Sequence, residues 1–392
     1  MGTTALQKPS STKLVQAPGI ILPGNGWRAP DARARELTKY FLDSIETTQK
    51  DAYKDGYNRK FLGMLNPEKR NPNLQPMLES IFSGEGERYL STHAARFLAD
   101  ALEKISICPN ITVVDEIDVS KLHIWRTNEW QYKSAVVSLP TDLDWATAIN
   151  AKEQANMGNK PDRFLAVMQH ILFIHSLVKS GMHVFLLRPR EDCPEMVFTR
   201  DVLLALHNKA IRGNMVADVR KNEQALIKNA IEPPPEVQLE FGNVFLEDKA
   251  GNFIIVGVGD RTNMAAVEWL QSIVGSDLNV IPIHLKKDIL HLDCVFSQIG
   301  RLIYPDAFVR QEDVALLQKL YGPLSILDAA NAKMLLGNLI SIHKALYVSP
   351  NEWLIDRLGN FYPVAEMALR TIDLGEITKA DGAHRCSTAP LL

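Results

Sequence analysis

The sequence predicts an α/β fold, because short apolar segments typical of strands alternate with helical segments through the chain after residue 117. Prolines and glycines separate these segments; Pro140 ends one expected strand and Gly181 precedes another. The chain has 392 residues, of which 46% are hydrophobic and 23% are charged, as in an ordinary globular protein. This length exceeds a typical single domain, so we expect either two domains or one large domain with an appendage.

The part of the chain before residue 118 has a different character. Its first 30 residues are rich in Pro, Gly, Ser and Thr, a composition typical of a flexible tail. Helical spacing of apolar residues begins after Asp31, which is a suitable N-cap, and returns near 74–83 and 91–106. The expected parts are therefore a tail at 1–30, a mainly helical extension at 31–117 and a large α/β domain at 118–392.

Within the α/β domain, apolar runs between turn residues predict strands, and apolar residues at helical spacing predict helices. The expected strands are 132–139, 183–187, 197–206, 237–246, 253–258, 280–284, 295–299, 339–346 and 364–372. The expected helices include 161–179, 263–273 and 312–321. No clear sequence repeat is visible, but the recurring strand–helix–strand units are compatible with a degenerate internal repeat.

Charge and hydropathy argue against several classes of protein. The formal net charge is −3, too near neutral for the basic surface of a nucleic-acid-binding or membrane-surface protein. No stretch approaches the roughly 18 uninterrupted apolar residues of a membrane-spanning helix. The first residues lack the apolar core of a signal peptide, and the four cysteines form no Cys-x-x-Cys pair. Together these features favour free thiols and a cytoplasmic location.

The segment His-Leu-Asp-Cys at 291–294 contains an imidazole and a carboxylate at a spacing of two. If the segment is a strand, alternation places His291 and Asp293 on one face. A carboxylate beside a histidine favours the protonated imidazole, which can donate a proton to a departing amine. The alternative is a solvated strand end without a function, because His-x-Asp is a common sequence.

Two further segments provide carboxylates. Asp201 ends a Phe-Thr-Arg-Asp segment and can accept paired hydrogen bonds from a planar cation. Glu240 begins a Glu-Phe-Gly-Asn segment and adds a second carboxylate for a buried positive charge, while Gly242 lets a backbone or a ligand approach closely. The alternatives are a charged surface loop at Asp201 and an edge-strand glutamate beside a bulge at Glu240.

Cys386 is the candidate nucleophile, and it must act as a thiolate. Neighbouring His384 and Arg385, or a cationic substrate, would favour the thiolate form, and Asp-Gly-Ala at 381–383 forms a turn of small residues before it. The alternative is an unreactive thiol near the end of the chain.

Other types of site have weaker support. His284, His291, Asp293 and Cys294 are ligand-type residues, but no His-x-x-x-His or Cys-x-x-Cys spacing accompanies them. The segment Gly-Val-Gly-Asp at 257–260 lacks the third glycine of a dinucleotide-binding turn, and no Gly-x-Ser-x-Gly elbow indicates a serine nucleophile. We therefore expect neither a metal ion nor an organic cofactor.

Taken in chain order, Phe-Thr-Arg-Asp (198–201), Gly-Asp-Arg-Thr-Asn (259–263), His-Leu-Asp (291–293) and the glycine turn before Cys386 resemble the guanidino-group-modifying superfamily. This superfamily includes arginine deiminases, dimethylarginine dimethylaminohydrolases, agmatine deiminases and glycine amidinotransferases. The resemblance covers roughly residues 118–392. It implies a pentein-like fold, a five-bladed αβ propeller of ββαβ-like units with the active site on its central axis.

The resemblance also implies roles for the matching residues. Cys386 matches the nucleophile, His291 the general acid and base, and Glu240 the acidic residue that begins the family's Glu-Gly-Gly-Asp segment. Asp201 and Asp293 match the carboxylates that hold the guanidinium, and Arg261 matches an arginine that holds the substrate's carboxylate. Asn243 replaces the family's aspartate and is kept as a substrate-binding candidate. Besides this replacement, Phe241 replaces a family glycine, and the turn before the cysteine reads Ala-Asp-Gly-Ala at 380–383.

The activity implied is a cysteine-dependent hydrolysis of arginine or a related guanidino compound through a covalent amidino-cysteine, or thiouronium, intermediate, with release of ammonia or an amine. One alternative is an amidinotransferase that passes the amidino group to an acceptor amine, because the first half-reaction is the same. Another is a non-catalytic protein that binds a guanidino compound or a partner. The extension at 31–117 has no recognised counterpart, which leaves capping of the site, partner binding and homo-oligomer formation open.

Overall fold

The computed structural model describes residues 108–122, 132–143, 148–206, 209–247, 253–276, 278–342, 345–359 and 368–391. The expected tail at 1–30 and the expected helices before residue 107 lie outside these described residues. Within the described part, no helix is both long enough and apolar enough to cross a membrane.

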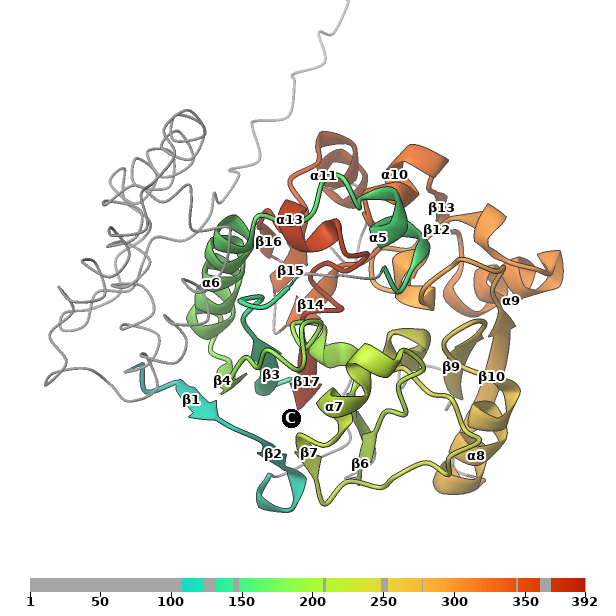
Figure 1. The fold of residues 1–392 in the computed structure, drawn as a ribbon. Helices are drawn as coiled ribbons and strands as arrows, with labels where there is room; N and C mark the ends of the chain where they lie inside the picture. The colour runs from blue at the N-terminus through green and yellow to red at the C-terminus, as the bar shows by residue number, and fades with distance from the viewer. Residues whose placement is uncertain are drawn as a thin grey trace, which may run out of the picture.

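The fold is α/β, as expected, and it is built from several small sheets with helices between their strands (Figure 1). Three sheets share one pattern, which we call the ββαβ unit. Two strands form an antiparallel pair, and a helix then leads to a third strand that is parallel to the second. The units are β8 (Val244–Glu247), β9 (Phe253–Val258), α8 (Met264–Val274) and β10 (Asn279–His284); β11 (Phe296–Ser297), β12 (Leu302–Ile303), α9 (Gln311–Tyr321) and β13 (Ser325–Ile326); and β14 (Ile340–Ile342), β15 (Ala345–Val348), α11 (Glu352–Gly359) and β16 (Ala368–Thr371).

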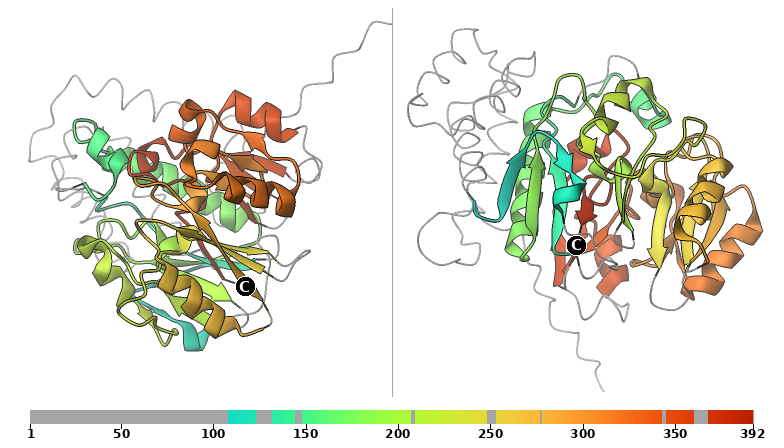
Figure 2. Two further views of the ribbon diagram at one scale, coloured as in Figure 1. Left: turned by 90° about the vertical axis from the view of Figure 1, so that its right-hand side faces the viewer. Right: turned by 90° about the horizontal axis from the view of Figure 1, so that it is seen from below.

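A fourth sheet completes the same pattern with the last strand of the chain. Strand β3 (Ser134–Ser138) leads through α6 (Arg163–Lys179) to the parallel strand β4 (His183–Leu187), and β17 (Ala389–Leu391) pairs antiparallel with β3. Strand β1 (Ile111–Val114) adds to the outer side of β4, so residues just before the expected boundary at 118 are joined to this sheet. Figure 2 shows β17 in red within the body of the molecule, and its pairing draws the C-terminal segment there.

The fifth group of strands is smaller. Strands β5 (Leu203–Leu206) and β6 (Lys209–Arg212) form an antiparallel pair, and Ile231 bridges to Ile211 in parallel after α7 (Lys221–Gln224). Strands β2 (Ile117–Asp118) and β7 (Ile227–Lys228) pair beside it. The remaining helices are the short α5 (Ala151–Ala155), α10 (Ala329–Lys333) and α13 (Gly375–Thr378).

The helix α6 shows how the sequence directs this packing. The side chain of Asp162 accepts a hydrogen bond from the Leu165 amide and so caps the first turn. Gly181, with a φ of +90°, follows the last turn and allows the chain to reverse into β4. Phe173 and Leu177 are fully buried and belong to the apolar cluster that joins α6 to β3 and β4, an arrangement that removes the apolar surface of both elements from water.

Most expected elements of the α/β domain are confirmed. The expected strands 183–187 and 253–258 are β4 and β9 with the same bounds, and α6, α8 and α9 match the expected helices within two residues. The single strand expected at 339–346 is instead the antiparallel pair β14 and β15.

The expected strands at 197–206 and 237–246, and the extended conformation considered for 291–294, are wrong in one respect. Each of these regions contains a one-turn 3₁₀ helix: η4 (Thr199–Asp201), η6 (Phe241–Asn243) and η7 (Leu292–Cys294). In two of them a backbone amide donates to a distant side chain rather than to a neighbouring strand. Gly242 N donates to Asp201 Oδ1 over 3.2 Å, and Leu292 N donates to Asn243 Oδ1 over 2.8 Å.

Candidate active site

All the candidate site residues except Arg261, which lies between β9 and α8, occupy equivalent places in the repeated units. In each unit they lie in the turn before the first strand: Asp201 before β5, Glu240 and Asn243 before β8, His291 and Asp293 before β11, and Cys386 before β17. The turn before β14, in the remaining unit, contains Asn338. The repeat therefore brings residues that are far apart in sequence to one place.

A small cavity lies at this place. Four of the seven predicted site residues line it: Cys386, His291, Asp201 and Arg261. The cavity is also lined by Ile149, Asn150, Glu195, Phe198, Arg220, Leu290, Ala380 and Asp381. Glu240 and Asp293 are buried behind the wall, where they contact the lining residues His291 and Cys386. Asn243 is also buried, but it bonds to Leu292 and Thr262, which do not line the cavity.

His291 lies between two carboxylates. Its Nε2 atom is 2.8 Å from Glu240 Oε2, and its Nδ1 atom is 3.6 Å from Asp201 Oδ1. The His291 side chain is fully buried, and Nδ1 has no hydrogen-bond partner among the described residues. One ring nitrogen is thus fixed by Glu240, while the other remains available for proton transfer.

The charges around His291 decide its protonation state. Burial alone would lower the pKa of His291, but the charge of Asp201, the Cys386 thiol and Glu240 together raise that pKa well above its usual value. Burial acts in the opposite direction on Glu240, yet the hydrogen bond and the charge of His291, helped by Arg261, lower the pKa of this carboxyl to about 2. The pair is therefore an imidazolium and a carboxylate at neutral pH.

Gly242 makes this packing possible. A Cβ atom at this position would lie 2.6 Å from His291 Nδ1 and 2.8 Å from Asp201 Oδ1, far inside van der Waals contact. Only glycine lets the turn before β8 pass between the imidazole and the carboxylate. A close approach at Gly242 was expected from the sequence, but the groups that approach are the side chains of His291 and Asp201 rather than a backbone or a ligand.

Asp201 is held by a buried arginine that the sequence analysis missed. Arg220 Nη1 donates to Asp201 Oδ2 over 2.6 Å, and Arg220 Nη2 donates to Glu223 Oε2 over 2.8 Å. Arg220 is only 3% exposed although it comes from a segment dense in charged residues. Such a segment usually forms a solvated surface, so composition gave no signal that this guanidinium faces the cavity.

Cys386 is positioned by Asn338, which the sequence analysis also missed. Asn338 Nδ2 donates to Cys386 Sγ over 2.9 Å, and Asn338 Oδ1 accepts from the backbone amides of Arg385 and Cys386 over 3.0 and 3.2 Å. A donor aimed at the sulfur stabilises negative charge on it. Its place in the repeated units is the signal that could have identified Asn338, because Asn338 occupies the position in its unit that Cys386 and Asp201 occupy in theirs.

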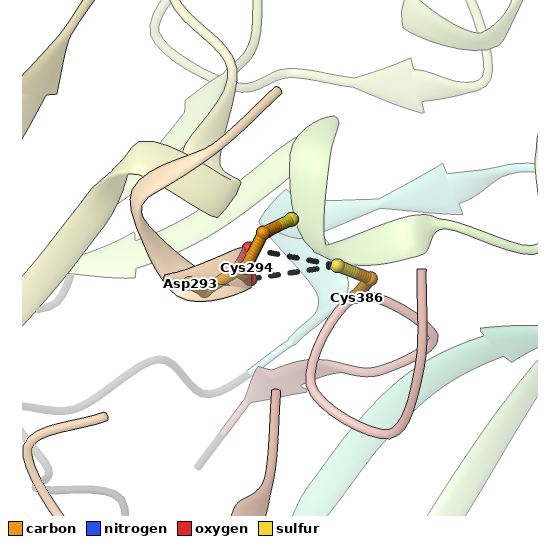
Figure 3. Close-up of side chains that lie close together, drawn as sticks. All are labelled: Asp293, Cys294 and Cys386. Carbon is orange, nitrogen blue, oxygen red and sulfur yellow. Dashed lines mark hydrogen bonds between the residues drawn. The ribbon is translucent and has the colours of Figure 1, made fainter. Parts of the chain in front are cut away.

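Asp293 lies beside the thiol and not beside His291 as the strand hypothesis placed it. Its two carboxylate oxygens are 3.5 and 3.6 Å from Cys386 Sγ (Figure 3), and Oδ2 also accepts from Arg385 Nη1 over 2.8 Å. The 3₁₀ turn η7 causes the difference, since successive side chains then point in different directions instead of alternating between two faces. The carboxylates beside His291 come from other units.

His384 and Arg385 do not flank the thiol as positive charges, which corrects that expectation. His384 Nε2 donates to the Ile372 carbonyl over 2.9 Å, and burial lowers the pKa of His384 to about 4, so the ring is neutral. The Arg385 guanidinium lies 4.0 Å from the centre of the Phe245 ring and pairs with Asp293. The charged imidazole that contacts the thiol comes instead from another unit, as His291.

Arg261 and Asn243 have different surroundings. Arg261 lines the cavity, with Nη1 3.6 Å from Glu240 Oε1 and Nη2 donating to the Ile149 carbonyl. Asn243 is fully buried behind the wall, where its Oδ1 accepts from Leu292 N and its Nδ2 donates to Thr262 Oγ1 over 3.0 Å. Asn243 thus orients the turn that carries His291.

A further acidic wall faces the cavity. Burial and the charge of Glu153 raise the pKa of Glu195 well above its usual value, which favours its neutral form. Burial also raises the pKa of Asp381, which lies 3.6 Å from Lys152 Nζ. Glu195 belonged to no motif, and Asp381 was considered only as part of the small-residue turn before Cys386.

Two groups of ligand-type side chains could hold a metal ion: Asp201, Glu240 and His291, and Asp293, Cys294 and Cys386. Within each group the potential ligand atoms lie within 4.8 Å of one another. In the first group, Glu240 Oε2 bonds to His291 Nε2 and Asp201 Oδ2 bonds to Arg220 Nη1, so one ligand-type atom of each residue is already engaged by a protein partner.

Comparison with known proteins supplies independent information. A family described as N,N dimethylarginine dimethylhydrolase, eukaryotic, matches residues 142–392. The uncharacterized protein YkgA of Bacillus subtilis is 30% identical over 285 residues, which cover 69% of this chain and 95% of that protein. The N(G),N(G)-dimethylarginine dimethylaminohydrolase of Streptomyces coelicolor is 27% identical over 248 residues, or 59% of this chain and 88% of that enzyme.

Solved structures agree at the level of the fold. The N-terminal domain of ArgZ, a cyanobacterial arginine dihydrolase, superposes with a TM-score of 0.58 at 21% identity and covers 66% of this chain and 97% of its own. A dimethylarginine dimethylaminohydrolase adduct superposes with a TM-score of 0.50 at 17% identity and covers 67% of this chain. The α/β fold described above is the fold of these proteins.

Proposed function

The chain belongs to the family described as N,N dimethylarginine dimethylhydrolase, eukaryotic, within the guanidino-group-modifying (pentein) superfamily, and we propose that it is a cysteine-dependent hydrolase of arginine or a related guanidino compound. One observation carries the proposal. A buried thiol, a buried charged imidazole and a carboxylate from three separate units line one cavity, as Cys386, His291 and Asp201. These are the groups that nucleophilic attack on a planar cation requires.

The first step is the binding of the guanidinium. Asp201 lines the cavity, and its Oδ1 atom makes a single hydrogen bond, with Gly242 N, so it can accept from a cation in the cavity. Asp293 is the second proposed carboxylate, which requires its hydrogen bond with Arg385 to loosen when substrate enters. Arg261 is the proposed partner for a carboxylate on the substrate. Positioning of this kind accounts for a large part of the rate gain available to such a reaction.

The second step is covalent. The Cys386 thiolate attacks the guanidinium carbon, and a carbon–sulfur bond forms while the carbon–nitrogen bond to the departing amine breaks. Charged His291 supplies the proton that the amine needs to leave. Neutral His291 then removes a proton from water, which attacks the amidino-cysteine and releases a ureido product and the free thiol. Glu240 keeps the imidazole oriented through both steps.

Mass spectrometry of the intact protein tests this mechanism. The protein is incubated with arginine, methylated arginines, agmatine or guanidinoacetate, the reaction is quenched with acid, and the intact mass of the protein is measured. Ammonia and amines are assayed in parallel. We expect one of these compounds to donate its amidino group to Cys386 and to form a covalent adduct there. We also expect ammonia or an amine to be released without any acceptor amine. Product formation that strictly requires an acceptor amine would indicate an amidinotransferase instead. Tight binding with neither adduct nor product would indicate a non-catalytic binding protein.

We also propose that the five strand groups are the blades of a five-bladed αβ propeller with the cavity on its axis. Three complete ββαβ units, the unit closed by β17 and the β5–β6 pair with its Ile231 bridge support this arrangement. The site supports it too, because each unit contributes a side chain from the turn before its first strand. In this proposal residues 118–392 form the catalytic domain, with β1 added at its edge. A crystal structure with the five sheets around one axis would verify it.

A further inference from the structure

A second cysteine lies against the proposed nucleophile, and the hydrolytic mechanism gives it no role. Cys294 and Cys386 are both free thiols and both buried, with exposures of 4% and 2%. Their sulfur atoms and the nearest carboxylate oxygen of Asp293 all lie within 4.8 Å of one another (Figure 3). Cys294 follows His291 by three residues, so it is carried by the same turn as the proposed acid and base.

The two cysteine-bearing segments are held together by one side chain. Asn338 donates from Nδ2 to the Asp293 carbonyl over 3.3 Å as well as to Cys386 Sγ, and its Oδ1 accepts from the Cys386 amide. The Cys294 thiol also contacts the Asp381 carbonyl at 3.7 Å. These contacts keep the sulfurs close without a covalent bond. Formation of a disulfide requires the two sulfur atoms to move from within 4.8 Å of each other to a bond length of about 2.05 Å.

The two sulfur atoms differ in their access to the cavity. Cys386 lines the cavity, whereas Cys294 is not among its lining residues and lies behind the nucleophile. The contact with Cys386, together with burial, raises the pKa of Cys294 well above its usual value, so Cys294 is a protonated thiol in the resting protein. A small oxidant that enters the cavity therefore meets Cys386 first.

We propose that Cys294 is a resolving thiol, which captures Cys386 as a reversible Cys294–Cys386 disulfide after a hydroperoxide has oxidised the nucleophile. In the first step the Cys386 thiolate attacks one peroxide oxygen; a sulfur–oxygen bond forms, the oxygen–oxygen bond breaks, and hydroxide or alkoxide leaves. In the second step Cys294 attacks the sulfenic sulfur. The disulfide forms, hydroxide leaves, and the proton of the Cys294 thiol converts that hydroxide into water.

Such a pair would switch off the enzyme and protect it at the same time. The disulfide removes the nucleophile from the cavity, so turnover stops for as long as the bond persists. It also prevents Cys386 from reaching the sulfinic acid, which a thiol reductant does not reverse. The loss of turnover rests on the function proposed above, whereas the disulfide itself does not.

The test compares the full-length wild type with Cys294→Ser, which keeps the side-chain size, and with Cys193→Ser as a control. Cys193 is buried but lies in a different apolar cluster from both residues of the pair. Each protein is treated with hydrogen peroxide in the presence of a chelator, alkylated and analysed by intact mass and by peptide mapping. Dimedone, which traps sulfenic acids, is added to parallel samples. Activity before and after dithiothreitol is expressed relative to the reduced form of the same protein.

We expect the wild type and Cys193→Ser to lose two hydrogen atoms, to yield a peptide that links Cys294 to Cys386, and to regain full activity after reduction. Cys294→Ser should label with dimedone at Cys386, go on to gain two or three oxygen atoms, and recover less than about a tenth of its activity. A Cys294→Ala variant with the same outcome would exclude an effect of the new hydroxyl. Its far-ultraviolet circular dichroism checks that the fold is retained.

Two results would overturn the inference. One is a wild type whose Cys386 reaches the sulfinic acid as fast as that of Cys294→Ser. The other is a linked peptide that pairs Cys386 with Cys108 or Cys193 instead. If the disulfide forms but the reduced wild type turns over no guanidino compound, the inference stands and the proposed function fails, so the two ideas are distinguished.

Discussion

The two sides of the cavity are built on different physical principles. The histidine side, made of His291, Glu240, Asp201 and Arg220, is a buried network of alternating full charges in direct contact. The thiol side, made of Cys386, Asn338, Asp293 and Cys294, contains one ion pair, between Asp293 and Arg385, and its sulfur is positioned by the neutral amide of Asn338, which also accepts from two backbone amides. The histidine side sets protonation states, whereas the thiol side sets the place of a single reactive atom. We expect mutations on the two sides to change turnover and stability in different ways.

Removal of the nucleophile should have the largest effect on turnover and almost none on stability. For Cys386→Ser we expect a loss of kcat of at least about a thousandfold, because a hydroxyl at neutral pH is a far weaker nucleophile than a thiolate. Serine is close to cysteine in size and keeps an acceptor for Asn338 Nδ2, so the melting temperature should stay close to that of the wild type. Steady-state kinetics and thermal unfolding of both proteins check this prediction. Turnover at the wild-type rate would remove Cys386 from the mechanism.

The glycine between the catalytic groups should rank next. In Gly242→Ala the new methyl group must displace His291 or Asp201, and we expect kcat to fall by about a hundredfold through lost positioning. Gly158→Ala is the matched control, because a Cβ there has no neighbour within 4 Å. Parallel assays of kcat and of melting temperature measure the two effects. Equal activity of the two variants would show that turnover tolerates a displacement of His291 or Asp201.

The amide of the thiol side should have a smaller effect. In Asn338→Ala the sulfur loses its donor and the amides of Arg385 and Cys386 lose their acceptor, so we expect kcat to fall about tenfold and stability to fall by about 1–3 kcal/mol. The rate of Cys386 alkylation by iodoacetamide, followed against pH, reports the change at the sulfur directly. An unchanged alkylation profile would assign Asn338 a purely structural role.

The smallest effect concerns acid stability, where the sign follows from the charges. The pKa of Glu240 is lowered in the folded protein, so its ionisation stabilises the fold above its usual value of 4.5 and this stabilisation is lost as the pH falls toward about 2. The difference in unfolding free energy between wild type and Glu240→Gln should therefore shrink across this window by a few kcal/mol. Urea titrations at several pH values measure it. A difference independent of pH would mean that Glu240 and His291 form no ion pair.

Much of the chemistry was predictable because it depends on residue types in short segments. Cys386, His291, Asp201 and Arg261 were expected at one site, and they line one cavity. Strands such as β4 and β9 were also predictable, since they pair with neighbours on both edges and their inward residues are apolar. These features depend on the local sequence or on simple alternation.

The conformation of the functional segments was not predictable in the same way. The turns η4, η6 and η7 lie in regions that were expected to be strands, because their sequences contain apolar residues next to a turn. The bonds Gly242 N to Asp201 Oδ1 and Leu292 N to Asn243 Oδ1 connect residues about 40 to 50 positions apart, and they exist only once the units have assembled. Local propensity has no information about such partners.

By itself, then, the sequence determined the alternation of strands and helices, the candidate reacting groups and the order of motifs that resembles the guanidino-group-modifying superfamily. The tertiary structure decided which charges meet: Arg220 at Asp201, Glu240 at His291, and Arg385 at Asp293. It also decided that Cys294 lies against Cys386. The physical reason is that protonation and reactivity depend on neighbours within a few ångströms, and here those neighbours come from different repeated units of the chain.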